Sequence, residues 1–245
     1  MSPVRFRQLT GLLFILVPAS MLAAFIWLQL TFDYPAILRQ PAGAVLARFQ
    51  AGGPSLIAAW YVFALSAAAF LPLAGLAHQV LRAEGAPVLP IALVSGAAAG
   101  LVQALGLIRW PFLVPALARA YLDPAASPAG REAALALYAA FNAYAGQAVG
   151  EHLGYLFTAL WTVLIALALR RSPLVWPWFG PAGVLTGVGI LAGLLEPAGV
   201  PGAGLVNAVA YTAWALWLIG LGAAWLRPAP AQPAPVHAAP AAGGA

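Results

Sequence analysis

The sequence has very little charge, no cysteine and no lysine. Only 7% of its 245 residues are charged, against about 25% in an ordinary soluble domain. A soluble protein needs far more charge to cover its surface, so this scarcity excludes a soluble enzyme and a disordered protein. The absence of cysteine excludes disulfides, thiolate nucleophiles, iron–sulfur clusters and cysteine-ligated zinc.

The small excess of positive charge does not indicate a nucleic-acid partner. The net charge of +5 comes from arginines that are spread thinly along the chain. No segment gathers them into the basic patch that binding to phosphates requires. We therefore expect no nucleic acid among the partners of this protein.

Long apolar runs stand where the charge is missing, and 63% of the residues are hydrophobic. A membrane-spanning helix needs about 20 mostly apolar residues. The first run outlasts the apolar core of a signal peptide, so we interpret it as a retained span. The sequence predicts an all-α, polytopic transmembrane helical bundle in a single domain, residues 1–226, with the lipid bilayer as its surroundings. The expected spans are residues 9–30, 55–81, 88–109, 149–169, 179–195 and 204–226.

The segments outside these spans are of unequal length. The first and third connections are long, and we expect interfacial helices in both, the first over Pro35–Gln50. In the third, Ser127 followed by Pro128 is typical of a helix N-cap with proline at the first helical position. Arginines near the span ends favour cytoplasmic N- and C-termini under the positive-inside rule. The Pro/Ala-rich tail, residues 227–245, is expected to be disordered.

Polar residues within the spans are costly in lipid and mark function by default. The alternating topology brings those of spans three to six to one face, opposite the termini. Around the fourth span, the helical period places one set of polar residues on the same side, namely Tyr144, Gln147, Glu151, Tyr155, Thr158 and Thr162. We expect a polar pocket that reaches part-way into the membrane from the outer face. The candidate residues for ligand binding or proton handling are Gln103, Arg109, Gln147, Glu151, His152, Tyr155, Glu196, Asn207 and Tyr211.

Charge pairing within this cluster has two interpretations. Arg109 is the one cation expected inside it, and Glu151 and Glu196 are its candidate carboxylate partners. A carboxylate such as Glu196 at a helix C-terminus needs a cation or a proton, because the helix dipole disfavours an anion there. Either Arg109 forms an ion pair with Glu151 or Glu196 that serves folding alone, or these residues form a site that handles a ligand or a proton.

The sequence predicts no metal site and no cofactor. Glu151 and His152 are neighbours on a helix, so their side chains point about 100° apart. His78 falls at the opposite end of the spans, some ~30 Å of hydrocarbon away. The aromatic residues near the span ends are expected to form interfacial belts. These are Trp27, Trp60, Tyr61, Trp110, Trp176, Trp178 and Trp225.

Four stretches of the chain carry a family resemblance. They are residues 32–41, with Phe-Asp-Tyr-Pro at 32–35 and Ile-Leu-Arg-Gln-Pro at 37–41, the segment 103–110, the Gly-Glu-His-Leu-Gly block that opens the segment 150–162, and Leu-Glu-Pro at residues 195–197. Together they resemble the bacterial domain-of-unknown-function family number 4386. The resemblance implies a multi-span protein of the bacterial inner membrane. It brings no reaction, ligand or catalytic residue with it.

Three functional hypotheses follow. In the first, the protein binds or moves a small or lipid-like ligand at the outer-face pocket and is not an enzyme. In the second, it is an intramembrane hydrolase or redox enzyme that uses Glu151 and His152. In the third, it is a structural or signalling protein whose long outer loops bind a protein partner, and the polar cluster serves folding alone.

Overall fold

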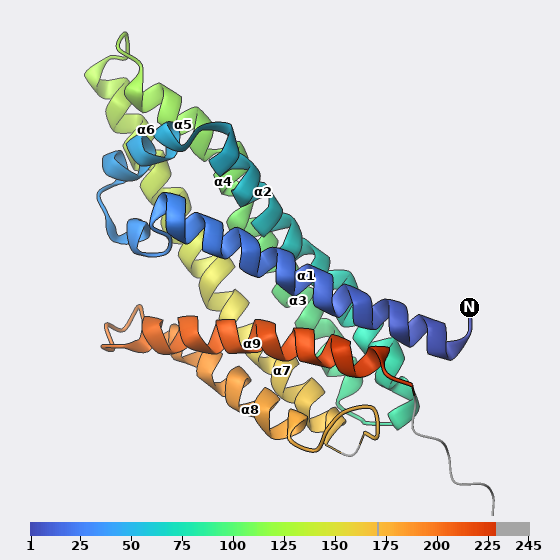
Figure 1. Ribbon diagram of the computed structural model, residues 1–245. Helices are drawn as coiled ribbons and strands as arrows, with labels where there is room; N and C mark the ends of the chain where they lie inside the picture. Colours follow the sequence, from blue (N-terminus) through green and yellow to red (C-terminus); the bar gives the residue numbers. More distant parts are fainter. Residues whose placement is uncertain (171, 229–245) are drawn as a thin grey trace, which may run out of the picture.

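The computed structural model describes residues 1–170 and 172–228, and within these ranges every regular element is a helix (Figure 1). Five helices are long and apolar enough to cross a membrane, and a sixth apolar helix over Phe179–Leu195 is shorter. The protein is therefore a multi-pass membrane helical bundle, as the apolar runs predicted. The five long helices cover Pro3–Phe32, Ala42–Leu81, Leu89–Leu122, Pro128–Leu169 and Ala203–Leu226. The predicted tail lies outside the described residues beyond residue 228.

Several of these long helices are divided into shorter elements. Residues 142–153 form a π-helix, η3, which has one extra residue per turn and joins α6 to α7. The elements in chain order are α1 (Pro3–Phe32), η1 (Ala36–Arg39), α2 (Ala42–Leu81), η2 (Arg82–Glu84), α3 (Leu89–Leu107), α4 (Arg109–Phe112), α5 (Val114–Leu122), α6 (Pro128–Phe141), η3 (Asn142–Leu153), α7 (Gly154–Leu169), α8 (Phe179–Ile190), η4 (Leu191–Leu195) and α9 (Ala203–Leu226).

Local sequence signals account for several helix boundaries. The Ser127 hydroxyl accepts a hydrogen bond from the Gly130 amide at 3.1 Å, which confirms the predicted N-cap of α6. Asp33, in a left-handed conformation, ends α1. Gly53 has a φ of 60°, and this position interrupts α2 between its first turns and the membrane-spanning part.

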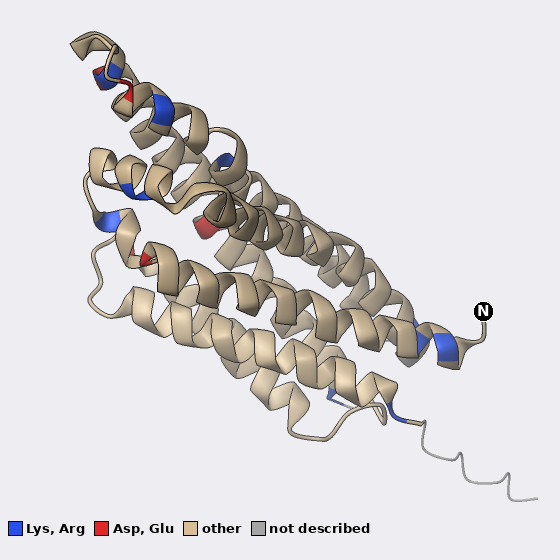
Figure 2. Ribbon diagram, turned by 45° about the horizontal axis from the view of Figure 1, so that its top comes forward, with Lys and Arg blue, Asp and Glu red and all other residues tan. Residues whose placement is uncertain are grey.

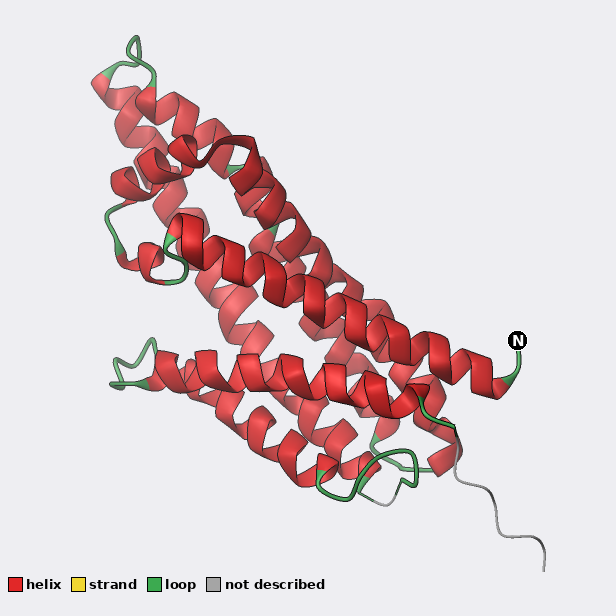
Figure 3. Cartoon of the chain, viewed as in Figure 1, coloured by secondary structure: helices red, strands yellow, loops and turns green. Residues whose placement is uncertain are grey.

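The two long connections contain the expected helices, which continue the neighbouring spans. The first turns of α2 precede Gly53, and α5 and α6 form a helical hairpin between α3 and η3. This hairpin projects past the rest of the bundle at the end away from the N-terminus (Figure 1). Most loops lie at the ends of the bundle, and short non-helical breaks separate α3, α4 and α5 (Figure 3).

The aromatic residues divide between the core and the surface. Trp60 and Trp110 are both 0% exposed and stack with ring centroids 4.3 Å apart. Trp225 is also fully buried, so the prediction of interfacial belts was wrong for these three residues. Their positions near span ends did not reveal that other helices cover them. Trp27 and Trp178 are about half exposed, as a belt position requires.

Glycines allow helix backbones to approach closely, as packing in lipid requires. A Cβ atom added at Gly106 would lie 2.5 Å from the Gly150 Cα atom, so α3 and η3 touch there. A Cβ atom at Gly11 would lie 2.7 Å from the Gly222 carbonyl oxygen, so α1 and α9 also touch. Helices α1 and α9 meet near the chain termini and draw apart toward the other end (Figure 1).

Candidate functional site

A cavity of about 560 Å³ lies between α1, α3, η3 and α9, in the half of the bundle opposite the N-terminus. Its volume is within the range of about 300–1,000 Å³ that small-molecule sites occupy. The structure brings together every candidate residue predicted from the sequence except His152. Those that line the cavity are Gln103, Arg109, Gln147, Glu151, Tyr155, Glu196, Asn207 and Tyr211.

A buried hydroxyl joins three helices beside this cavity. Thr158 on α7 is 0% exposed, and its hydroxyl accepts hydrogen bonds from the Gln103 amide at 3.0 Å and the Tyr211 hydroxyl at 3.2 Å. Asn207 on α9 donates to the carbonyl of Ile190 at 2.7 Å, where α8 gives way to η4. These bonds satisfy polar groups that lipid could not hydrate, and they fix the relative positions of α3, α7, α8 and α9.

Arg109 is buried, and among the described residues it forms no ion pair with a carboxylate. It is 7% exposed, and its guanidinium donates to the Gly106 carbonyl and to the Asn142 side-chain oxygen, the latter at 3.1 Å. Among the described residues, no carboxylate lies within ion-pair distance of it. The predicted pairing of Arg109 with Glu151 or Glu196 was therefore wrong, because a backbone carbonyl and an amide oxygen take its N–H groups.

Glu196 has a different cation as its partner. The Nη2 atom of Arg39, the last residue of the 3₁₀ turn η1, lies 3.4 Å from the carboxylate of Glu196. The sequence placed Arg39 in the expected interfacial helix of the first connection and not in the polar cluster. The prediction that Arg109 is the one cation at this site was therefore wrong. Charged residues gather at the ends of the bundle and around this cavity, while the helix bodies between are almost free of them (Figure 2).

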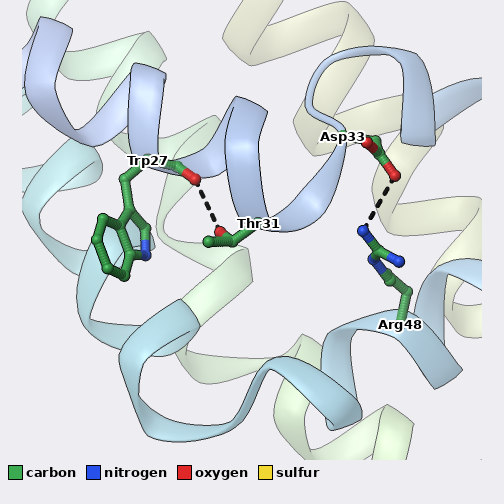
Figure 4. A network of polar contacts seen from close by, with 4 residues as sticks. All are labelled: Trp27, Thr31, Asp33 and Arg48. Carbon is green, nitrogen blue, oxygen red and sulfur yellow. Dashed lines mark hydrogen bonds and ion pairs between the residues drawn. The ribbon is translucent and has the colours of Figure 1, made fainter.

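The loop after α1 folds back to form one wall of the cavity. Tyr34, Pro35, Leu38 and Arg39 all line it. The loop is held by Arg48 on α2, whose Nη2 atom lies 3.1 Å from the Asp33 carboxylate (Figure 4). In the last turn of α1, the Thr31 hydroxyl donates to the Trp27 carbonyl at 2.7 Å (Figure 4).

Tyr34 is the tyrosine that this loop contributes. Its ring packs edge-on against Trp60, with the centroids 5.1 Å apart. Burial, and after it the negative charge of Glu151, raises the pKa of the Tyr34 phenol above its ordinary value. This shift strengthens the preference of the Tyr34 phenol for its protonated form, in which it can donate a hydrogen bond.

The flank of the cavity between α1 and α9 is mostly apolar. Met21, Leu22 and Phe25 contribute from α1, and Leu205 and Ala208 contribute from α9. Polar lining from the same two helices comes from Gln29 on α1 and from Asn207, Tyr211 and Thr212 on α9. The cavity thus has polar residues on α3, η3 and α9 and a group of apolar residues where α1 and α9 face each other.

The π-helix places the polar residues of the fourth span. Gln147 and Glu151 lie on η3, and Tyr155 follows in the first turn of α7. A sequence argument based on the α-helical period also assigned Tyr144 to this face. Tyr144 is instead 72% exposed, because the extra residue per turn changes the direction in which successive side chains point. π-helical segments are often found at functional sites.

His152 points away from this site. It is exposed and does not line the cavity, whereas its neighbour Glu151 does. This separation agrees with the roughly 100° between adjacent side chains on a helix. Within the described ranges, no group of three or more acidic, histidine or cysteine residues is placed to hold a metal ion.

Sequence reasoning missed the residues that the first loop brings to the cavity. Arg39 and Tyr34 lie outside every predicted span, so neither hydropathy nor helical period marked them. The Phe-Asp-Tyr-Pro segment that contains Tyr34 was noticed, but as part of a family resemblance. The sequence signal that could have pointed to the site was an aromatic residue, Tyr34, within a stretch that carries the family resemblance.

The family assignment rests on most of the chain. Residues 9–222 match the family described as Domain of unknown function (DUF4386). The chain belongs to this family. The match covers every residue that lines the cavity of this DUF4386 protein. No curated protein and no solved structure matches the chain.

Proposed function

We propose that this protein binds a small, lipid-like ligand in the cavity between α1, α3, η3 and α9. The observation that carries the proposal is the convergence of polar side chains from separate helices on a single cavity inside a membrane bundle. Polar and ionisable groups in such a position are expensive unless they serve a partner. A volume of about 560 Å³ admits a headgroup with part of an acyl chain.

The apolar side of the cavity supports a ligand that comes from the bilayer. Met21, Phe25 and Leu205 line the part where α1 and α9 separate. A hydrocarbon chain lying there would contact apolar side chains, while its polar end would reach Gln103 and Glu151. A purely water-soluble ligand would leave this apolar lining without a partner.

Orientation is part of the proposal. Arg5, Arg7, Arg82, Arg170 and Arg227 lie on the side of the termini, against Arg39, Arg48, Arg119 and Arg131 on the other side, where Arg109 is buried. Under the positive-inside rule this side is cytoplasmic. The cavity then belongs to the outer half of a bacterial inner membrane.

The alternative of an enzyme that uses Glu151 and His152 together receives no support from their positions. Their side chains do not share the cavity, because His152 is exposed on the other side of the helix. An enzyme would need another pair of groups from the lining.

Native mass spectrometry of the full-length protein, purified in mild detergent, tests the proposal. We expect the wild type to retain a lipid-sized mass, and Glu151→Gln to lose it while its melting temperature stays the same. His152→Gln changes the next residue, which is off the cavity, and is expected to retain the mass. Equal retention by Glu151→Gln and His152→Gln, or no retained mass in the wild type, would overturn the proposal.

A further inference from the structure

The charges around the cavity are only partly matched. Four charged side chains line it, two positive and two negative: Arg39, Arg109, Glu151 and Glu196. Arg39 and Glu196 pair with each other at 3.4 Å. Arg109 and Glu151 are left over, and among the described residues neither forms an ion pair.

Arg109 is a cation in the wall of the cavity, and among the described residues it has no counter-ion. It is 7% exposed, its guanidinium carbon lies 5.2 Å from the centroid of the Trp110 ring, and its buried Nε atom has no hydrogen-bond partner. The neighbouring Gly146 leaves room for the guanidinium, since a Cβ atom at that position would lie 2.7 Å from its Cζ atom. The planar fork of a guanidinium suits a phosphate or a carboxylate.

Glu151 is the negatively charged counterpart of Arg109 in the cavity. Its carboxylate lines the same cavity from η3, and within the described residues it has neither a hydrogen bond nor an ion pair. A partly buried carboxylate without a partner is costly. An ammonium group, with its three N–H donors, is the ligand group that matches it.

The two unmatched charges together define the ligand's headgroup. A purely anionic ligand would satisfy Arg109 but repel Glu151, and a purely cationic one would do the reverse. A group that carries both charges satisfies both residues. Resting on the proposed function, we infer that the cavity binds a zwitterionic amphiphile, with its anionic group on Arg109 and its ammonium on Glu151.

The hydrocarbon part of this ligand has its own place. Phe25 on α1 and Leu205 on α9 line the side of the cavity where these helices separate. An acyl chain leaving between them would enter the bilayer without crossing the polar lining. Phosphatidylethanolamine has this combination of charges and chains, and soluble glycerophosphoethanolamine has the same charges without the chains.

Competition binding on the full-length protein in detergent tests the inference. The probes are phosphatidylethanolamine, phosphatidylglycerol with only the anion, a dialkyl trimethylammonium amphiphile with only the cation, and soluble glycerophosphoethanolamine. We expect phosphatidylethanolamine to bind about tenfold or more tightly than each of the other three, which corresponds to about 1.4 kcal/mol. Equally tight binding of soluble glycerophosphoethanolamine would overturn the inference that the ligand is an amphiphile.

Two substitutions assign the charges, each with a matched control away from the cavity. Glu151→Gln should abolish the preference for phosphatidylethanolamine over phosphatidylglycerol, and Arg109→Gln should abolish the preference over the cationic amphiphile. The controls are Glu132→Gln and Arg119→Gln, which change exposed residues on α6 and α5 and should keep both preferences. Should Arg109→Gln fail to fold, Gly146→Ala displaces the same guanidinium and is expected to weaken binding of both phosphate lipids.

The outcomes separate this inference from the proposed function. Binding of all three lipids with equal affinity, weakened to the same extent for each by Glu151→Gln, would overturn the zwitterionic headgroup while leaving a lipid-binding cavity. A preference for phosphatidylglycerol over phosphatidylethanolamine would also overturn the zwitterionic headgroup and leave a lipid-binding cavity. No binding of any lipid to the wild type would overturn both the headgroup assignment and the proposed function.

Discussion

Gly11 on α1 and Gly222 on α9 bring the backbones of the first and last helices into direct contact. A Cβ atom added at Gly11 would lie 2.7 Å from the Gly222 carbonyl oxygen and 3.2 Å from the Trp225 Cβ atom. At the same end, the Arg7 guanidinium donates to the Arg227 carbonyl at 2.7 Å. The two helices are therefore held together near the termini. Beyond this contact they separate, and there both line the cavity.

Gly11→Ala is expected to destabilise the protein. The added methyl group meets a backbone carbonyl that cannot turn aside, and overpacking of this kind costs about 1–3 kcal/mol. The matched control is Gly75→Ala on α2, where an added Cβ atom has no neighbour within 4 Å. Thermal unfolding in detergent should show a lower melting temperature for Gly11→Ala alone. Equal melting temperatures for the two variants would contradict the close contact.

Thr158→Val is expected to disturb the bonds that join α3, α7 and α9. The Tyr211 hydroxyl would lose its acceptor, and an unsatisfied buried group costs about 1–3 kcal/mol. Thr212→Val is the matched control, because the exposed Thr212 hydroxyl bonds only within its own helix, to the Ala208 carbonyl at 2.9 Å. Chemical denaturation of both variants measures the difference. A Thr158→Val protein as stable as the control would show that this network contributes nothing.

The ion pair between Arg39 and Glu196 should stabilise the fold only slightly. Arg39 is mostly exposed and Glu196 is partly exposed, and exposed ion pairs typically contribute about 0.2–1 kcal/mol. A double-mutant cycle with Arg39→Ala and Glu196→Ala measures the coupling. We expect a value in that range that falls as salt is added. A coupling above about 2 kcal/mol, insensitive to salt, would mean that the pair is shielded from water.

The helices could be predicted from the sequence, and so could much of the site. Apolar length alone identified the spans, and their alternation correctly brought Gln103, Asn207 and Tyr211 to one place. These predictions depend on local pattern and on topology, which the sequence records directly. The predicted cap at Ser127 has the same basis.

The remaining parts of the site depend on tertiary contacts. Arg39 reaches Glu196 because a loop folds back over the helix ends, and no periodicity encodes that fold. Arg109 turns to a carbonyl and to Asn142 instead of a carboxylate, which depends on its rotamer. Tyr144 left the predicted polar face because a π-helix replaced the regular period. The burial of Trp60 and Trp110 similarly depends on which helices pack across the kink at Gly53.

Membrane orientation can be measured cleanly because the chain has no cysteine of its own. Ala83, after α2, lies at the end of the bundle where the termini are, and Ala125, between α5 and α6, lies at the other end. Ala125→Cys should react with a membrane-impermeant maleimide in intact cells, and Ala83→Cys only after the membrane is opened. The reverse pattern would place the cavity on the cytoplasmic side.

The central claim is that the cavity holds a lipid-like ligand, and photo-crosslinking in native membranes tests it most directly. Tyr155 lines the cavity, and Trp27 is half exposed and does not. With benzoylphenylalanine at Tyr155, we predict an adduct of one lipid class that disappears when Glu151→Gln is added. With the probe at Trp27, adducts should follow the bulk lipid composition and be unaffected by Glu151→Gln. The absence of any adduct at Tyr155, or adducts there that match those at Trp27 and survive Glu151→Gln, would contradict the claim.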